Sequence, residues 1–296
     1  MYNRIFGTVY GYIAADLVCI LYWIFLSGIK LFLEVSLRMK TSPVIFMLLV
    51  SALAADPCAE RNNAFQTGEA ITYKIYYRVA GVYAGAGEAV FTAALAQLSG
   101  KTVYHVTGSG KTNGLFDGFF KVRDTYESYI DTGTLQPYKF IRTVSEGSHK
   151  TYENVSFNKV TNTALTNKGV FKIPACVQDV ISAMYYTRNV NFSHLQIHDT
   201  IPFSMFLDNQ VYPLYIRYLG RETIKTKYGK FRTIKFKPLL IKGTLFEGGE
   251  KMTVWVTDDD NHVPVRVEGP ILVGSVIVDM TDFRGRRHPL TALIDL

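Results

Sequence analysis

One glycine-rich stretch has residue types that could bind phosphate. Gly108-Ser109-Gly110-Lys111-Thr112 ends in Gly-Lys-Thr, as a phosphate-binding loop does. Such a loop needs another glycine five residues before the Gly-Lys pair, where His105 stands, and a helix directly after it. Asn113-Gly114 follows instead. The pattern therefore favours the glycine-rich end of a strand.

Two other stretches have metal-ligand residue types. His194 and His198 are four residues apart, which can place two ligands on one face of a helix. Residues 191–199 have the composition of a polar connector, and no third ligand is close in sequence. Asp258-Asp259-Asp260-Asn261 could supply oxygens to Ca²⁺, but Asp and Asn also favour tight turns, and strand-like runs flank this stretch. We therefore predict no metal and no cofactor.

Hydrolytic chemistry has no recognisable motif in the sequence. Ser, His and Asp are all present, but the Gly-x-Ser-x-Gly elbow of many hydrolases is not. Four carboxylates lie scattered over strand-like runs and do not form a catalytic pair: Asp124, Glu127, Asp131 and Glu146. An uncharacterised hydrolase stays an alternative without positive support.

The aromatic content offers a different chemistry, the binding of an apolar ligand. The chain has 19 Tyr and 19 Phe, several of them clustered. Aromatic residues fill cores and pair across strands, but they also line grooves for apolar or glycan ligands. Both interpretations are open. The groove candidates are Tyr73, Tyr77, Phe116, Phe119, Phe120, Tyr185, Tyr186, Arg188 and Trp255.

The elements that must position these residues are strands. Apolar and polar residues alternate over 71–79, and similar runs recur about every ten residues as far as 283. Short polar connections such as Asp208-Asn209 predict hairpins. Strands at this spacing without helices between them predict a mainly antiparallel, all-β domain over 55–296.

One segment has helical spacing instead. Val177, Val180, Ile181 and Met184 recur at helical intervals after Pro174, which suits a helix start. We expect one amphipathic helix around 175–189, joining two halves at about 65–172 and 198–284. The tail after Gly285 is expected to be loosely held.

The first 54 residues have the pattern of export signals. A positive Lys40, the apolar run Val44–Val50 and the small-residue site Ala52-Leu53-Ala54 together predict a signal peptide over 39–54, starting at Met39. An earlier apolar stretch, 9–33, is broken by Asp16 and Gly28. We interpret residues 1–38 as upstream sequence before the true start, with a genuine N-terminal anchor as the alternative.

Beyond this leader the chain has two cysteines, Cys58 and Cys176. A pair of cysteines in an exported protein predicts a disulfide. Asp56-Pro57 precedes Cys58, which disfavours its lipidation. The net charge of +7 comes from 32 basic and 25 acidic residues mixed along the chain, so we predict no nucleic-acid partner.

The mature part resembles the exported bacterial proteins grouped as domain of unknown function family 3108, from Gram-negative envelopes. The matching motifs follow in order: Phe65-Gln-Thr-Gly-Glu-Ala-Ile-Thr-Tyr73, Gly87-Glu-Ala89, Phe120-Lys-Val-Arg-Asp-Thr-Tyr-Glu-Ser-Tyr-Ile-Asp131, Leu135-Gln-Pro137, Asp179-Val-Ile-Ser-Ala-Met-Tyr-Tyr-Thr-Arg188, Gly229-Lys-Phe231, Phe236-Lys-Pro238 and Trp255-Val-Thr-Asp-Asp-Asp-Asn-His-Val-Pro-Val265. The resemblance implies export and a β fold, but no catalytic residue or cofactor. By analogy with periplasmic lipoprotein carriers, it implies an open, curved sheet crossed by a helix.

Together these observations predict an all-β fold built as a large curved sheet, an open barrel or a sandwich. We expect a periplasmic or outer-membrane-associated, non-enzymatic protein that binds an apolar or amphipathic envelope ligand. The alternative is a scaffold protein that binds another envelope protein through a sheet edge.

Overall fold

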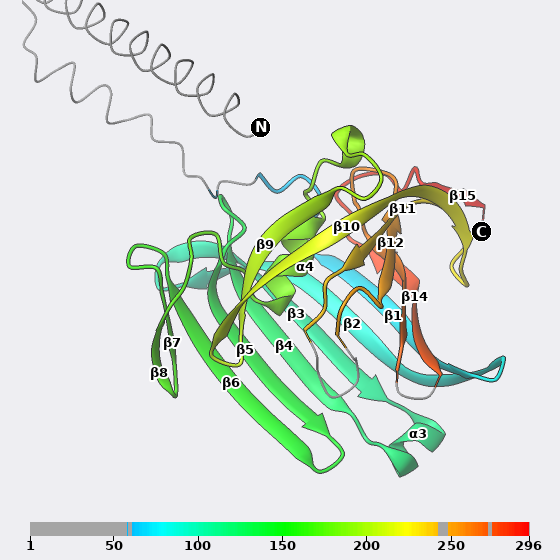
Figure 1. The fold of residues 1–296 in the computed structure, drawn as a ribbon, viewed down its shortest axis with the longest axis horizontal. Helices are drawn as coiled ribbons and strands as arrows, with labels where there is room; N and C mark the ends of the chain where they lie inside the picture. The colour runs from blue at the N-terminus through cyan, green and yellow to red at the C-terminus, as the bar shows by residue number, and fades with distance from the viewer. Residues whose placement is uncertain (1–57, 59–60, 242–247, 272–273, 296) are drawn as a thin grey trace, which may run out of the picture. The chain divides into compact units, whose positions relative to one another are not determined.

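Alternating segments of the sequence form the strands of a single antiparallel sheet (Figure 1). The computed structural model describes Cys58 and residues 61–241, 248–271 and 274–295, so the predictions for residues 1–38 and 39–54 lie outside the described residues. The strands are β1 Glu69–Val79, β2 Val82–Leu98, β3 Lys101–Thr112, β4 Arg123–Asp131, β5 Pro137–Glu146, β6 His149–Asn158, β7 Thr163–Thr166, β8 Gly169–Lys172, β9 Thr200–Leu207, β10 Gln210–Lys225, β11 Lys230–Pro238, β12 Thr253–Thr257, β13 Pro264–Pro270, β14 Ser275–Arg284 and β15 Leu293–Asp295.

The order of the strands joins two meanders side by side. It runs β8-β7-β6-β5-β4-β3-β2-β1-β14-β13-β12-β11-β10-β9, with β15 paired to β11. The junction is the antiparallel pairing of β1 with β14, which places Ile71 opposite Phe283. The prediction of an all-β, mainly antiparallel fold with a large open sheet is confirmed, and the sandwich alternative is wrong because all the described strands share one sheet.

The sheet curls until its two end regions approach each other. The ring of Phe206 on β9 lies 6.0 Å from that of Phe157 on β6 and 5.9 Å from Phe171 on β8. The helix α4, Val180–Thr187, contacts β3 and β4 as well as β9. It therefore lies between the two arms of the curved sheet (Figure 1).

Helix α4 is shorter than the predicted 175–189. The backbone of Gln178 is paired with β9, since its N–H donates to Ser204 and its carbonyl accepts from Phe206. Asp179 then caps the helix: its carboxylate accepts from the N–H groups of Ile181 and Ser182, at 2.8 Å each. The extended pairing before the cap is why the helix starts at Val180, well after Pro174.

Three features were not expected. A six-residue helix α3, Gly114–Phe119, and a short 3₁₀ helix η2, Phe192–His194, add to α4. The expectation of a loose tail is wrong, because β15 pairs with β11 and Ala292 is fully buried. Among the described residues, no helix is both long and apolar enough to cross a membrane.

A disulfide joins Cys58 to Cys176, whose Cα atoms lie 5.2 Å apart. The bond closes a loop of 118 residues and attaches the start of the described chain to the segment that leads into α4. One face of α4, with Ile181 and Tyr185, packs into a core formed with Val106, Ile130 and other residues of β2–β7. The opposite face of α4 is the starting point of the site described next.

Candidate ligand-binding cavity

The face of α4 that turns away from this core borders a cavity of about 440 Å³. The size lies within the usual range of small-molecule sites. The helix contributes Val180, Ala183, Met184 and Thr187, and the other lining residues come mainly from the inner faces of β1, β2 and β9–β14: Tyr73, Ile75, Ala89, Phe91, Arg188, Phe203, Ile216, Phe236, Pro238, Leu240, Met252, Val254, Val256, Pro264, Val267 and Val278. The lining is almost wholly aliphatic and aromatic.

The main polar groups in this lining have partners within the protein. The hydroxyl of Tyr73 donates to the carbonyl of Pro264 at 3.0 Å, and burial raises the pKa of Tyr73 well above its usual value. The guanidinium of Arg188 donates to both carboxylate oxygens of Glu69, at 2.6 and 2.8 Å. Burial alone would lower the pKa of Arg188, but the adjacent Glu69 carboxylate raises it. A ligand in the cavity therefore meets an apolar wall.

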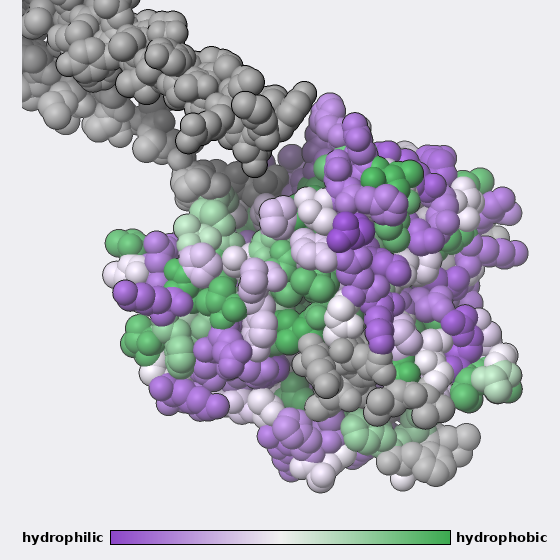
Figure 2. Space-filling view, viewed as in Figure 1, coloured by the Kyte–Doolittle hydropathy of each residue, from purple (hydrophilic) through white to green (hydrophobic). Residues whose placement is uncertain are grey.

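A smaller hollow of about 230 Å³ continues from this cavity. The two share four lining residues, Ala89, Phe91, Val180 and Met184. The smaller hollow adds Gly108, Ser109, Gly110, Asp124, Tyr126 and Ile181. Burial, with the nearby Asp124 carboxylate, raises the pKa of Tyr126 to about 12, so its hydroxyl stays protonated. On the side of the molecule seen in Figure 1, apolar residues gather near the middle, with polar residues on either side (Figure 2).

The glycines explain why the hollow exists. A Cβ atom on Gly108 would lie 2.6 Å from the ring of Phe91, whereas a Cβ atom on Gly110 would meet no atom within 4 Å. The Gly-Ser-Gly motif therefore lies within strand β3, as the sequence favoured, and it makes room on the inner face of the sheet.

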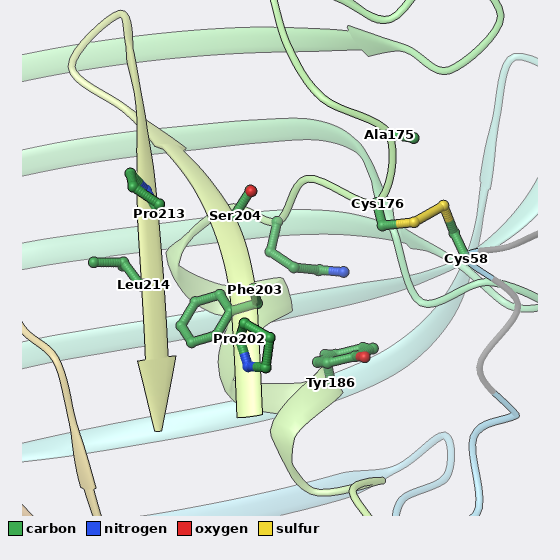
Figure 3. A pocket seen from close by; sticks show the side chains of 10 residues that line it. Cys58, Ala175, Cys176, Tyr186, Pro202, Phe203, Ser204, Pro213 and Leu214 are labelled. Atoms are coloured by element: carbon green, nitrogen blue, oxygen red, sulfur yellow. A yellow bond between two sulfur atoms is a disulfide. The ribbon is translucent and has the colours of Figure 1, made fainter. Parts of the chain in front are cut away.

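A third hollow, of about 350 Å³, lies beside the disulfide (Figure 3). Its lining includes Cys58, Cys176, Tyr186, Pro202 and Gln178. Figure 3 shows the disulfide on the segment that leads into α4, with Tyr186 on the helix itself. Phe203 lines both this hollow and the large cavity.

The helix cap is itself a buried charge site. Asp179 is fully buried, and Ser128 donates to its carboxylate at 2.6 Å. Burial raises the pKa of Asp179 to about 6, against the opposing effect of the donors from Ser128, Ser182 and Ile181. The group holds α4 in place and does not line the cavity.

The predicted groove residues are divided among several places. Two of them, Tyr73 and Arg188, line the large cavity, and Tyr186 lines the third hollow. Tyr185 is buried on the core side of α4, where its ring lies 4.7 Å from that of Phe65.

The remaining candidates are placed elsewhere. The rings of Tyr77 and Phe116 lie 6.2 Å apart, and Phe120 is exposed. Trp255 stands between the cavity residues Val254 and Val256, so the strand pleat directs it to the other face, where its Nε1–H donates to Glu222 at 2.5 Å. The side chain of Phe119 lies outside the described part of the structure.

Most of the cavity wall was not among the candidates, because it is aliphatic. Val180, Ala183, Met184 and Thr187 follow the i, i+3, i+4, i+7 spacing of one helix face. On β1, Ile75 alternates with Tyr73, and on β12, Val254 alternates with Val256, which is the ordinary signal of a strand face that points inward. The sequence carried this signal, but it is the same signal that a filled core gives.

The two metal-ligand patterns lie in a connector and in a turn. His194 and His198 are both exposed in the connector before β9, and the carboxylate of Asp259 accepts from Thr257 and from the backbone of Asn261, as in a turn. Over the described ranges, no group of three or more His, Cys, Asp or Glu side chains is placed to hold a metal ion.

Comparison with known families gives one assignment. The family model "Protein of unknown function (DUF3108)" matches residues 72–281, well over half of the chain. The chain belongs to this family. The match runs from within β1 to within β14 and therefore includes all the residues that line the large cavity. No match was found among curated proteins.

Solved structures with similarity to this DUF3108 chain share little sequence with it. A β-barrel-like DUF1849 protein from Brucella abortus has a TM-score of 0.49 at 6% identity, covering 73% of this chain and 96% of its own. A provisionally assigned lipoprotein from Parabacteroides distasonis has a TM-score of 0.34 at 9% identity, covering 76% and 99%. A provisionally assigned exported protein with a YmcC-like fold from Bacteroides fragilis has a TM-score of 0.28 at 15% identity, covering 77% and 100%.

Proposed function

We propose that this DUF3108 protein is an exported, non-enzymatic binding protein that holds an apolar or amphipathic envelope molecule between α4 and the sheet. The observation that carries the proposal is the cavity of about 440 Å³ with its apolar lining. The charged residue in this lining, Arg188, is already paired with the buried Glu69. Apolar surface that a ligand covers contributes roughly 25 cal/mol per Å². A wall of this kind therefore favours a ligand with a substantial hydrocarbon part.

Export is part of the same proposal. It is supported by the signal-peptide pattern over 39–54 and by the disulfide between Cys58 and Cys176, since disulfides persist in oxidising compartments such as the periplasm. The same features support a periplasmic or outer-membrane-associated location.

Substitutions on one strand test the binding proposal. Ala89 faces inward and borders both the large cavity and the smaller hollow, whereas Ala94 on the same strand is exposed. We expect Ala89→Trp to fill the junction and Ala94→Trp to leave it open. The probe is N-phenyl-1-naphthylamine, an uncharged fluorophore that brightens in apolar sites.

We expect the fluorophore to bind the wild-type protein saturably and to bind Ala89→Trp at least about tenfold more weakly. A tenfold loss of affinity corresponds to the burial of fewer than two methylene groups. Ala94→Trp should bind like the wild type. Thermal melting checks that both variants fold. Absence of saturable binding to the wild type, together with no lipid retained after incubation with envelope extract and native mass spectrometry, would overturn the proposal.

A scaffold role through a sheet edge has less support. At the β9 edge, Gln178 already pairs with Ser204 and Phe206. Pro202, two residues before Ser204, faces the same edge and has no N–H to offer an added strand. The other edge strand, β8, has four residues. Both ends of the sheet are thus poorly suited to strand addition.

A hydrolase has less support still. His105 Nε2 lies 2.8 Å from a Glu127 oxygen and 3.4 Å from the hydroxyl of Thr107. Both partners meet the same ring nitrogen, whereas a catalytic triad needs the nucleophile on one nitrogen and the carboxylate on the other. This arrangement fits a polar cluster on the sheet better than a reacting centre.

A further inference from the structure

We infer that the cavity takes a single-chain amphiphile whose hydrogen-bond-donating, non-anionic end lies at Asp124 while its hydrocarbon chain lies beneath α4. The inference rests on the proposed function and assigns an orientation and a head-group class to the ligand. Its basis is a row of three residues that leads from the large cavity to one carboxylate, Ala89, Gly110 and Asp124, which we call the trough.

The trough follows the register of three neighbouring strands. Ala89 on β2 is opposite Gly110 on β3, and Gly110 is opposite Asp124 on β4. All three line the smaller hollow, and Ala89 also lines the large cavity. Because a Cβ atom at Gly110 would meet nothing within 4 Å, the middle of this row is open space. An alkyl chain can therefore pass from the cavity over Ala89 and Gly110.

The polar end of the ligand is assigned to Asp124, the charged group in the lining of the smaller hollow. In the large cavity, Tyr73 and Arg188 are already bonded to Pro264 and Glu69. At the other end of the trough, Asp124 accepts the backbone N–H of Ser145 through Oδ1, at 2.9 Å. A carboxylate has about four acceptor positions on its two oxygens, so Asp124 can accept further donors from a ligand.

The charge at this end selects the head group. Arg142 on β5 lies opposite Tyr126, another residue of the smaller hollow, and is paired with Glu153 at 3.0 Å and with Asp208. The Asp124 carboxylate would repel an anionic head, and the described lining of the smaller hollow contains no Lys or Arg to offset this repulsion. An ammonium or hydroxyl head can donate to it, and a donor that carries charge makes the stronger bond.

Three probes with the same ten-carbon chain test the assignment, each used below its micellar concentration: decylammonium, decyl maltoside and decanoate. Wild-type protein should bind decylammonium about ten- to a hundredfold more tightly than decanoate, the range of a charge-assisted hydrogen bond, with decyl maltoside between them. Asp124→Asn keeps an oxygen for Ser145 and should reduce this ratio to less than about threefold. Asp282→Asn, which changes a carboxylate paired with Arg284, is the matched control.

A second pair of variants tests the route. Gly110→Trp should weaken all three probes by at least about tenfold because it fills the trough, whereas Gly85→Trp, at an exposed glycine of β2 with equally open surroundings, should not. Equal wild-type affinities for the three probes would overturn the assignment of the head group to Asp124. So would a decylammonium-to-decanoate affinity ratio that is unchanged in Asp124→Asn. Either result would leave the proposed function standing. Failure of every probe to bind the wild type would instead count against the proposed function.

Discussion

Arg188 and Glu69 form a bidentate ion pair in the protein interior, with Nη1–Oε1 at 2.6 Å and Nη2–Oε2 at 2.8 Å. The side chains are 2% and 0% exposed, so neither charged group is solvated by bulk water. Arg188 directly follows α4 and Glu69 begins β1, so the pair ties the end of the helix to the centre of the sheet. It keeps α4 over the cavity without presenting a free charge to a ligand.

Removing one member of this pair should destabilise the protein severely. We expect Arg188→Met or Glu69→Leu to lower the free energy of unfolding by about 3–5 kcal/mol, since each leaves the other charge buried and unpaired. The double variant should cost much less than the two single changes together. Urea denaturation measures all three, and strictly additive losses would contradict the coupling.

The buried cap Asp179 should make stability depend on pH. Its pKa is about 6 in the folded protein against 3.8 for an ordinary Asp, so the folded state binds more protons between these values. This contribution is fully present below about pH 4 and is lost as the pH rises through about 6, on the order of 2–3 kcal/mol. The difference in unfolding free energy between the wild type and Asp179→Asn, followed from pH 4 to 7, isolates this group, because Asn is also a good N-cap. A difference that does not change with pH would refute the prediction.

The disulfide should be a large contributor to stability. Chain-entropy estimates for a loop of more than 100 residues give about 4–5 kcal/mol, and this loop has 118. We expect Cys58→Ser with Cys176→Ser, or reduction of the wild type, to lower the melting temperature by the same amount. Reductant should leave the double variant unchanged, and a reduced wild type that melts like the oxidised protein would argue against the contribution.

Two glycines of β3 should respond differently to the same substitution. Gly108→Ala would place a methyl group 2.6 Å from the Phe91 ring, which must move aside, so we expect a loss of about 1–3 kcal/mol. Gly110→Ala enters open space and should be neutral or stabilising by a few tenths of a kcal/mol. Chemical denaturation compares the pair, and equal stabilities would show that the Phe91 contact carries no strain.

Much of the fold could be predicted because its signals are local. Alternation identified strands such as β1, helical spacing found α4, and the cysteine count suggested the bond that the structure contains. The start of α4 was missed because Gln178 is held by β9, a contact between distant segments. The site was only partly foreseen, since register and pleat decide that Tyr73 faces the cavity while Trp255 faces away from it.

The pairing of β1 with β14 also governs when this chain can fold. Ile71 and Phe283 are more than 200 residues apart, yet they are partners in the middle of the sheet. As the ribosome delivers the chain from its N-terminus, β1 can pair with β2 but must wait for nearly the whole sequence before its second edge is covered. Contacts of such long range slow folding and leave a bare strand edge exposed meanwhile. The second edge of β1 therefore stays uncovered until β14 has been synthesised, and a chain truncated before β14 would lack the strand that joins the two meanders.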